Sequence, residues 1–240
     1  KRVVLVLLLL ATVYGCSVGV RTGGTVSSGS DVVEPPAIGP LPPRETPNPR
    51  LVELGKMLFF DDRLSGDASM SCATCHQPDK GWADGVALGT AYPDSQGFRN
   101  TKTILNAVYG DYFYWDGRLS RSDLQTQVRD MITETHYLNM DGRLMLERLK
   151  QVPEYVELFE ETLGGEPSFG RALTAVAAFE ETLVSRNAPF DTGKMSAEAK
   201  RGRRLFEGKA GCISCHNGPY FSDGRAHATG VEDNADLIAN

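Results

Sequence analysis

Two pentapeptides with the pattern Cys-x-x-Cys-His constrain this chain more than any other feature of its sequence. The first, CATCH, occupies residues 72–76, and the second, CISCH, occupies residues 212–216. Their four cysteines are all the cysteines of the 240-residue chain except Cys16. Paired cysteines can form disulfides, hold zinc or attach a prosthetic group, so the neighbouring residues must decide between these uses.

The residue after each pair favours the third use. The two pairs of a four-cysteine zinc site usually lie about 15–20 residues apart, and these pairs are much further apart. A histidine follows each pair directly, and Cys-x-x-Cys-His is the attachment signature of c-type haem. We therefore predict two covalently bound haem c groups, with disulfides and zinc as the alternatives. The predicted haem-binding residues, with histidine as the iron ligand, are Cys72, Cys75 and His76, and Cys212, Cys215 and His216.

The N-terminal segment is typical of an export signal. Lys1 and Arg2 precede an apolar run over 3–14, which is shorter than the roughly 20 residues that span a bilayer. The sequence VYGC resembles the lipobox of bacterial lipoproteins, in which the cysteine is acylated. We expect residues 1–16 to be a lipoprotein-type signal of a periplasmic protein, anchored to the membrane only through Cys16. An ordinary signal with a stray cysteine is the alternative.

Residues 17–50 are predicted to be a flexible tether. The first half is rich in glycine and serine and the second half in proline, and neither half has enough apolar residues to fold alone. The chain carries a formal net charge of −6 and no basic tract. This charge argues against nucleic acid as a partner.

Helical periodicity dominates the rest of the chain. Asn48 and Pro49 are typical of the start of a helix. Further helices are expected around 124–131 and at 141–151, 153–163, 169–186 and 196–208. In the helix over 169–186, Glu180 interrupts an otherwise apolar face. No alternating strand pattern is present, so we predict an all-α fold with mostly short helices and long loops.

The two haem motifs follow a common scheme. Each comes after a helix that ends in LFFD or LFEG, and such a repeat indicates two related domains. We therefore expect two cytochrome c-like haem domains, an N-terminal one over 51–185 and a C-terminal one over 186–240 that is truncated.

Several stretches together resemble one known family, the bacterial di-haem cytochrome c peroxidases and their MauG-like relatives. These stretches are LGKMLFFDDRLSGDASMSCATCHQPDKGWADG, RNTKTILN, YFYWDGR, RNAPFD and RRLFEGKAGCISCHNGPYFSDG, within residues 51–231. The resemblance implies that hydrogen peroxide is reduced to water with electrons from a small redox protein, a cytochrome c or a cupredoxin. It also implies that the N-terminal haem is peroxidatic and that the C-terminal haem transfers electrons.

The resemblance assigns roles to three further residues. Trp115 matches the tryptophan that lies between the two haems and can carry an electron across the gap; a core aromatic is the alternative. Arg118 is expected to pair with a haem propionate, with a surface salt bridge as the alternative. Asn100 matches an asparagine that helps to bind a calcium ion between the domains.

The distal side of the first haem departs from the family pattern. The peroxidases carry a capping histidine in a Gly-His context after the first motif, but here Thr90 follows Gly89. We therefore expect an iron with an open distal position. His136 could cap this iron, but an exposed histidine at a helix end is the simpler interpretation.

The acid–base residue of the distal pocket is also open. Gln127 fits the family's glutamine best, with Gln125 as a rival. The family's glutamate should follow ten residues later, where Tyr137 stands, and Glu134 is close by but out of register. Gln127 and Glu134 are the residues we expect to move protons during the cleavage of peroxide.

Two other functions fit the same residues. One is a MauG-like di-haem oxidase that modifies residues of a partner protein, and the other is a non-enzymatic di-haem electron carrier. The sequence leaves open whether the protein forms a homodimer.

Overall fold

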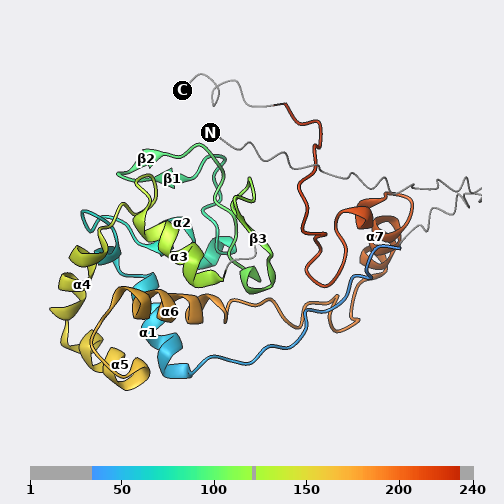
Figure 1. The fold of residues 1–240 in the computed structure, drawn as a ribbon. Helices are drawn as coiled ribbons and strands as arrows, with labels where there is room; N and C mark the ends of the chain where they lie inside the picture. Colours follow the sequence, from blue (N-terminus) through green and yellow to red (C-terminus); the bar gives the residue numbers. More distant parts are fainter. Residues whose placement is uncertain (1–33, 121–122, 233–240) are drawn as a thin grey trace, which may run out of the picture. The chain divides into compact units, whose positions relative to one another are not determined.

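The computed structural model describes residues 34–120 and 123–232 (Figure 1). The chain divides into a short unit over residues 1–34 and a second unit from Pro35 to Asn240. The predicted signal and most of the predicted tether lie outside the described residues. Everything below concerns the second unit.

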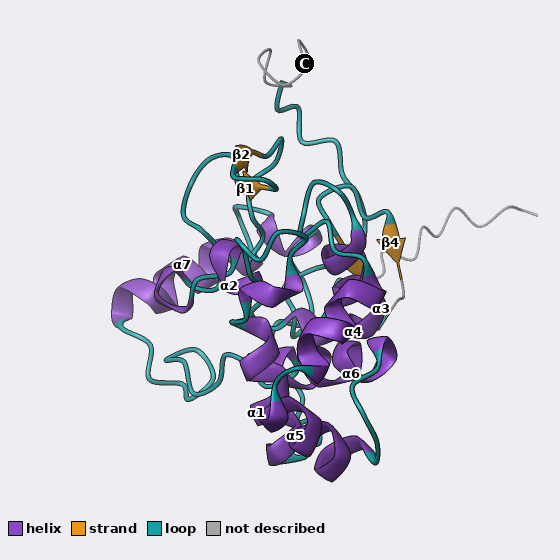
Figure 2. Ribbon diagram, turned by 90° about the vertical axis from the view of Figure 1, so that its left-hand side faces the viewer, coloured by secondary structure: helices purple, strands orange, loops and turns teal. Residues whose placement is uncertain are grey.

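Helices make up most of the regular structure, as predicted (Figure 2). They are α1 (Pro49–Phe59), α2 (Cys72–Cys75), α3 (Leu124–Thr133), α4 (Gly142–Lys150), α5 (Pro153–Leu163), α6 (Phe169–Glu180) and α7 (Ala197–Glu207). Short 3₁₀ turns occur at Asp62–Leu64, Pro78–Lys80, Ala107–Tyr109 and Cys212–Ser214. Among the described residues, no helix is long and apolar enough to cross a membrane.

Two antiparallel ladders were not foreseen. Strand β1 (Thr90–Ala91) pairs with β2 (Ser95–Gln96), with Thr90 opposite Gln96. Strand β3 (Tyr112–Phe113) pairs with β4 (Leu119–Ser120), with Tyr112 opposite Ser120. Each strand has two residues, which is too short to show an alternating pattern in the sequence.

The helix boundaries follow from local signals. At α1, the Asn48 side chain accepts a hydrogen bond from the Arg50 backbone, as expected for an N-cap. Helix α5 begins at Pro153 and ends before Gly164, which adopts a left-handed conformation with φ of 67°. These two predictions are confirmed.

Helix α6 is shorter than the predicted span of 169–186. It ends at Glu180, because the following residues turn to meet the loop that contains Asn106. The Asn106 backbone donates to the Leu183 carbonyl at 2.8 Å, and its side chain accepts from the Ser185 backbone at 2.8 Å. Tertiary hydrogen bonds therefore replace the last turns of the predicted helix.

Helix α6 lies at the centre of the core. It packs against α1, α3 and α4, and most of its residues are buried. Its approach to α1 is close, because a Cβ added at Gly55 would lie 1.8 Å from the Ala175 carbonyl oxygen. At one end, the rings of Phe59, Trp82 and Phe179 pack edge to face, with centroids 5.1–5.8 Å apart.

The described end of the predicted tether contacts the rest of this unit. Ile38 is buried, and the Pro36 carbonyl accepts a hydrogen bond from the Gly218 backbone at 3.0 Å. The Tyr109 hydroxyl donates to the Pro42 carbonyl at 2.6 Å. These contacts hold residues 36–42 against the loop that follows the second pentapeptide and against the turn at Tyr109.

Candidate functional site

The first pentapeptide forms helix α2 and the turn that follows it. The Ser71 backbone donates to the Thr74 hydroxyl at 3.0 Å, and the His76 backbone donates to the Cys72 carbonyl at 2.9 Å. The ring of His76 is fixed by its Nδ1 atom, which lies 3.0 Å from the Trp82 carbonyl oxygen. Because a carbonyl can only accept, Nδ1 carries the proton, and Nε2 is left with a free lone pair.

Burial keeps all three functional groups of this motif uncharged. It raises the pKa of the Cys75 thiol to about 11 and raises that of Cys72 further. It also lowers the pKa of His76, against the effect of the hydrogen bond to Trp82. A neutral imidazole with a free Nε2 is the form that ligates haem iron.

The second pentapeptide is built in the same way. Cys212 begins a 3₁₀ turn over Cys212–Ser214, Cys215 follows it, and the His216 backbone donates to the Cys212 carbonyl at 2.9 Å. The Nδ1 atom of His216 lies 3.2 Å from the Phe221 carbonyl oxygen. In both motifs, therefore, a carbonyl five or six residues further along orients the imidazole.

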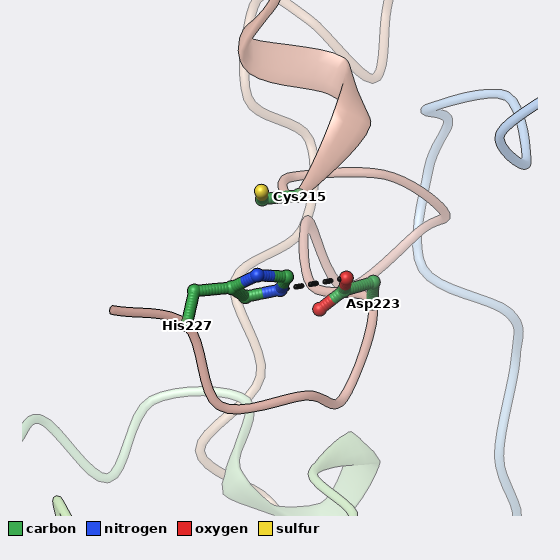
Figure 3. A group of neighbouring side chains, drawn as sticks. All are labelled: Cys215, Asp223 and His227. Atoms are coloured by element: carbon green, nitrogen blue, oxygen red, sulfur yellow. Dashed lines mark hydrogen bonds and ion pairs between the residues drawn. The ribbon is translucent and has the colours of Figure 1, made fainter. Parts of the chain in front are cut away.

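The alternatives of disulfides and a shared zinc site find no support in the described part of the chain. Cys72, Cys75, Cys212 and Cys215 are all free thiols. The only group of three or more possible metal ligands among the described residues is Cys215, Asp223 and His227, whose ligand atoms lie within 4.8 Å of one another (Figure 3). It contains one cysteine of a single pair and not both pairs.

This small cluster is part of the second haem motif. Nε2 of His227 lies 2.9 Å from Oδ2 of Asp223, and the Asp223 backbone donates to the Cys215 carbonyl at 2.9 Å. Burial acts to raise the pKa of Asp223, but hydrogen bonds from His227 and the Arg225 backbone outweigh it and lower the pKa. The pair braces the loop that follows His216.

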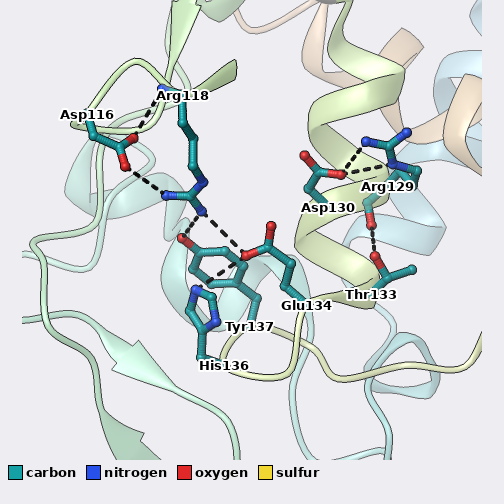
Figure 4. A network of polar contacts seen from close by, with 8 residues as sticks. All are labelled: Asp116, Arg118, Arg129, Asp130, Thr133, Glu134, His136 and Tyr137. Carbon is teal, nitrogen blue, oxygen red and sulfur yellow. Dashed lines mark hydrogen bonds and ion pairs between the residues drawn. The ribbon is translucent and has the colours of Figure 1, made fainter.

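A polar network surrounds Arg118, next to helix α3 (Figure 4). Its guanidinium lies 3.4 Å from a carboxylate oxygen of Asp116 and 3.4 Å from one of Glu134, and it donates to the Tyr137 hydroxyl at 3.3 Å. It also stacks on the Tyr114 ring, 3.7 Å from the centroid. The arginine expected at a propionate thus has two carboxylate partners within the chain.

His136 is not the exposed histidine that the sequence favoured. Its ring is half-buried, 4.0 Å from the Tyr137 centroid and 5.6 Å from that of Phe98. Its Nε2 atom is buried and lies 3.5 Å from Oε2 of Glu134, which is longer than an ordinary hydrogen bond. Of its neighbours, Glu134 and Tyr137 are close in the sequence, whereas Phe98 comes from a distant loop that no sequence pattern connects with His136.

Trp115 is exposed, which contradicts the alternative of a core aromatic. Its side chain is 58% exposed, and its indole donates to the Asn100 carbonyl at 2.7 Å. The ammonium of Lys102 lies 5.1 Å from the centre of the ring. Asn100 itself donates its side-chain amide to the Val86 carbonyl at 2.5 Å. Its predicted role as a calcium ligand stays a prediction.

Glu180 is a buried acid whose charge affects the first motif. The residue is 5% exposed, and its Oε2 atom has no hydrogen-bond partner in the described structure, which is rare for a buried polar atom. Burial raises its pKa to about 8, and its charge contributes to the raised pKa of Cys72. The fit of a haem at this motif rests on other groups: two free thiols for the thioether bonds and a free Nε2 lone pair on His76.

Comparison with known proteins identifies the family. Residues 49–200 match the family model described as di-haem cytochrome c peroxidase. The chain belongs to the di-haem cytochrome c peroxidase family.

Named relatives agree with this assignment. The chain is 51% identical to cytochrome-c peroxidase IdrP2 of Pseudomonas sp. (strain SCT), over 85% of this chain and 57% of that protein. It is 42% identical to methylamine utilization protein MauG of Methylorubrum extorquens, over 82% of this chain and 58% of that protein. It thus spans less than two thirds of the length of each relative.

A solved structure shows the same fold. The crystal structure of a MauG-like protein associated with microbial copper homeostasis superposes with a TM-score of 0.67 at 23% identity. The match covers 78% of this chain and 60% of that one.

The acid–base residues predicted for the distal pocket of a di-haem cytochrome c peroxidase lie on α3 and at its end. Gln127 is half-buried on α3, whereas its rival Gln125 is exposed. Glu134 caps the end of α3 and belongs to the Arg118 network, together with Tyr137. The roles of Gln127, Glu134 and Arg118 stay predictions, and the sequence did not indicate that Arg118 and Glu134 contact Tyr137 and His136.

Proposed function

We propose that the protein is a di-haem peroxidase that reduces hydrogen peroxide to water with electrons from a small redox protein, a cytochrome c or a cupredoxin. The observation that carries this proposal is the shared construction of the two motifs. Each presents an imidazole whose Nδ1 is held by a backbone carbonyl. The reaction consumes two electrons and two protons per peroxide, so a pair of one-electron centres suits it.

The chain's own residues orient the ligands and exclude water. Haem bound at such motifs supplies an iron that can bind peroxide or pass electrons, depending on its axial ligands. His76 would ligate the iron through Nε2, because Nδ1 is engaged by the Trp82 carbonyl. The rings of Phe59, Trp82 and Phe179 pack behind that carbonyl and keep the loop in place.

Proton movement is assigned to Gln127 and Glu134. Cleavage of the O–O bond needs a proton taken from one peroxide oxygen and returned to the other. A carboxylate can do both, and an amide can hold the substrate by hydrogen bonds. Arg118 lies 3.4 Å from Glu134 and holds that carboxyl group in position.

Electron transfer between the haems is assigned to Trp115. Its indole N–H is held by the Asn100 carbonyl at 2.7 Å, which fixes the ring. Lys102 over the ring opposes a positively charged indole, so Trp115 would carry charge only briefly. Arg118 remains the candidate partner for a haem propionate.

A turnover assay tests the proposal. The haem-loaded protein, given hydrogen peroxide and reduced cytochrome c, should oxidise two cytochromes per peroxide. Replacing both cysteines of either motif by serine should abolish this turnover. Oxidation of the protein's haems by an electrode, without any reaction with peroxide, would instead support a di-haem electron carrier.

A MauG-like oxidase is the second candidate. It is favoured by the 42% identity to a MauG protein and by the exposure of Trp115, which is 58%. An exposed aromatic could pass oxidising equivalents to a partner protein. Peroxide-driven modification of a partner without consumption of reduced cytochrome c would favour this function.

Several further features are proposals that rest on the sequence pattern. These are two cytochrome c-like domains over 51–185 and 186–240, export to the periplasm, a lipid anchor at Cys16, calcium at Asn100 and a homodimer. Metal analysis of the purified protein, mass spectrometry of its N-terminus and sedimentation would test the last three.

A further inference from the structure

Glu180 is a buried acid for which the turnover proposed above has no role. It lies at the end of α6, on the face that packs into the core, and is 5% exposed. The ring of the preceding residue, Phe179, contacts the ring of Trp82 with centroids 5.8 Å apart. The carbonyl of Trp82 is the one that orients His76. Glu180 therefore directly follows a residue that packs against the loop of the first haem motif.

Among the described residues, no ion pair to Glu180 is present. Its Oε2 atom has no hydrogen-bond partner in this part of the chain, and burial accounts for the rise of its pKa to about 8. The charge of Glu180 in turn acts to raise the pKa of the Cys72 thiol, which loses its proton for good when it becomes a thioether.

The charged residues of the helices packed against α6 are engaged elsewhere or exposed. On α1, Lys56 is exposed and Glu53 pairs with Arg50. On α3, Arg129 and Asp130 pair with each other. On α4, the Arg148 guanidinium donates to the carbonyls of Ser65 and Gly66.

We propose that Glu180 couples the uptake of one proton to the reduction of the haem on Cys72: its carboxyl group is ionised when the haem iron is ferric and becomes a neutral carboxylic acid when the iron is ferrous. Reduction brings one electron to the iron and removes one positive charge from the buried site. The Glu180 carboxylate takes one proton from solvent in the same step, so that the charge of the site is unchanged. The electron comes from any donor that reduces the haem.

The physical reason is the low polarity around Glu180. A buried carboxylate without a cation partner is costly, and the positive charge of ferric iron lowers that cost. Loss of that charge on reduction raises the pKa of Glu180 further. Glu180 thus has a lower pKa when the iron is ferric and a higher pKa when it is ferrous. At a pH between these two values, each electron is accompanied by a proton. This coupling requires haem on Cys72 but no particular reaction, so it holds for a peroxidase, an oxidase or a carrier.

The test is a redox titration of the holoprotein at a series of pH values, followed by optical spectra. In the wild type, the midpoint potential of one haem should not depend on pH below the pKa that Glu180 has in the ferric protein. Above that pKa, the potential should fall by about 59 mV per tenfold drop in proton concentration. In Glu180→Gln, which keeps the size of the side chain, that potential should not depend on pH in the same range. The two proteins should agree at acid pH, and the variant should have the higher potential at alkaline pH.

Glu181→Gln is the matched control, because it makes the same change at the next residue, which is half-buried and whose carboxyl oxygens are not among the buried atoms without a partner. It should keep the wild-type pH dependence. A Glu180→Gln protein with the same slope as the wild type would overturn the proposal.

A second measurement needs no variant. Infrared difference spectra of the oxidised and reduced wild type should contain the C=O band of a protonated carboxylic acid, shifted in heavy water. The absence of any such redox-linked band would also overturn the proposal, even if Glu180→Gln failed to take up haem.

Discussion

The Nδ1 atom of His76 lies 3.0 Å from the carbonyl oxygen of Trp82. This contact fixes the tautomer of the imidazole and points Nε2 away from the backbone. The equivalent atom of His216 lies 3.2 Å from the Phe221 carbonyl oxygen, so both motifs orient the imidazole with a main-chain acceptor. A main-chain acceptor cannot be removed by substitution of a side chain, so the orientation of the ligand is protected from most mutations.

The first prediction concerns the open side of the N-terminal haem. Because the family's capping histidine is replaced by Thr90, the ferric holoprotein should show a high-spin component in its EPR spectrum. His136→Ala should leave that component unchanged, because His136 is packed between Phe98 and Tyr137. Conversion of an entirely low-spin haem to high spin by His136→Ala would instead make His136 the cap.

The second prediction concerns proton transfer. Glu134→Gln should lower kcat by about 10²–10⁴, the usual contribution of a general acid–base residue. Gln127→Ala should also lower kcat, whereas Gln125→Ala, at an exposed position on the same helix, should not. Steady-state assays with reduced cytochrome c measure all three. Equal effects of the two glutamine variants would contradict the assignment of Gln127.

Sequence reasoning succeeded where the signal is local. The helix start at Asn48 and Pro49 and the full extent of α5 follow from caps and from proline and glycine positions. The haem motifs are likewise contiguous, so their residues can be read from the sequence. Helix α6 was predicted too long, because the Asn106 contacts that end it come from a distant loop.

The candidate site shows the same limit. The grouping of Arg118, Glu134 and Tyr137 depends on how the segment after α3 turns back on itself. The burial of Glu180 could be suspected from its place on an apolar face. That its Oε2 atom has no hydrogen-bond partner among the described residues could not. Such facts depend on which charged residues neighbouring helices bring near, and residue spacing does not encode them.

The third prediction concerns the contact between α1 and α6. Gly55→Ala should destabilise the protein by at least about 1–3 kcal/mol, because overpacking forces the helices apart. Its added Cβ would lie 1.8 Å from the Ala175 carbonyl oxygen. Gly170→Ala is the matched control on α6, where an added Cβ meets no atom within 4 Å. Urea unfolding should show a stability equal to or above the wild type for the control.

The last prediction concerns the pH dependence of stability through the cap of α4. The Asp141 carboxylate accepts hydrogen bonds from the backbones of Leu144 and Arg143, at 3.2 and 2.9 Å. Hydrogen bonds from the Leu144 backbone and from Arg143 lower the pKa of Asp141. A lowered folded-state pKa adds stability that is present above the unfolded-state pKa and is lost as pH falls through the folded-state value.

Asp141→Ala should therefore be less stable than the wild type at neutral pH, and the difference should shrink below about pH 4, the ordinary pKa range of aspartate. Asp141→Asn should retain most of the stability at neutral pH, because asparagine caps helices nearly as well. Thermal unfolding of the three proteins over a series of pH values measures both effects. A gap between Asp141→Ala and the wild type that does not change down to acid pH would mean that the capping bonds do not depend on the charge of Asp141.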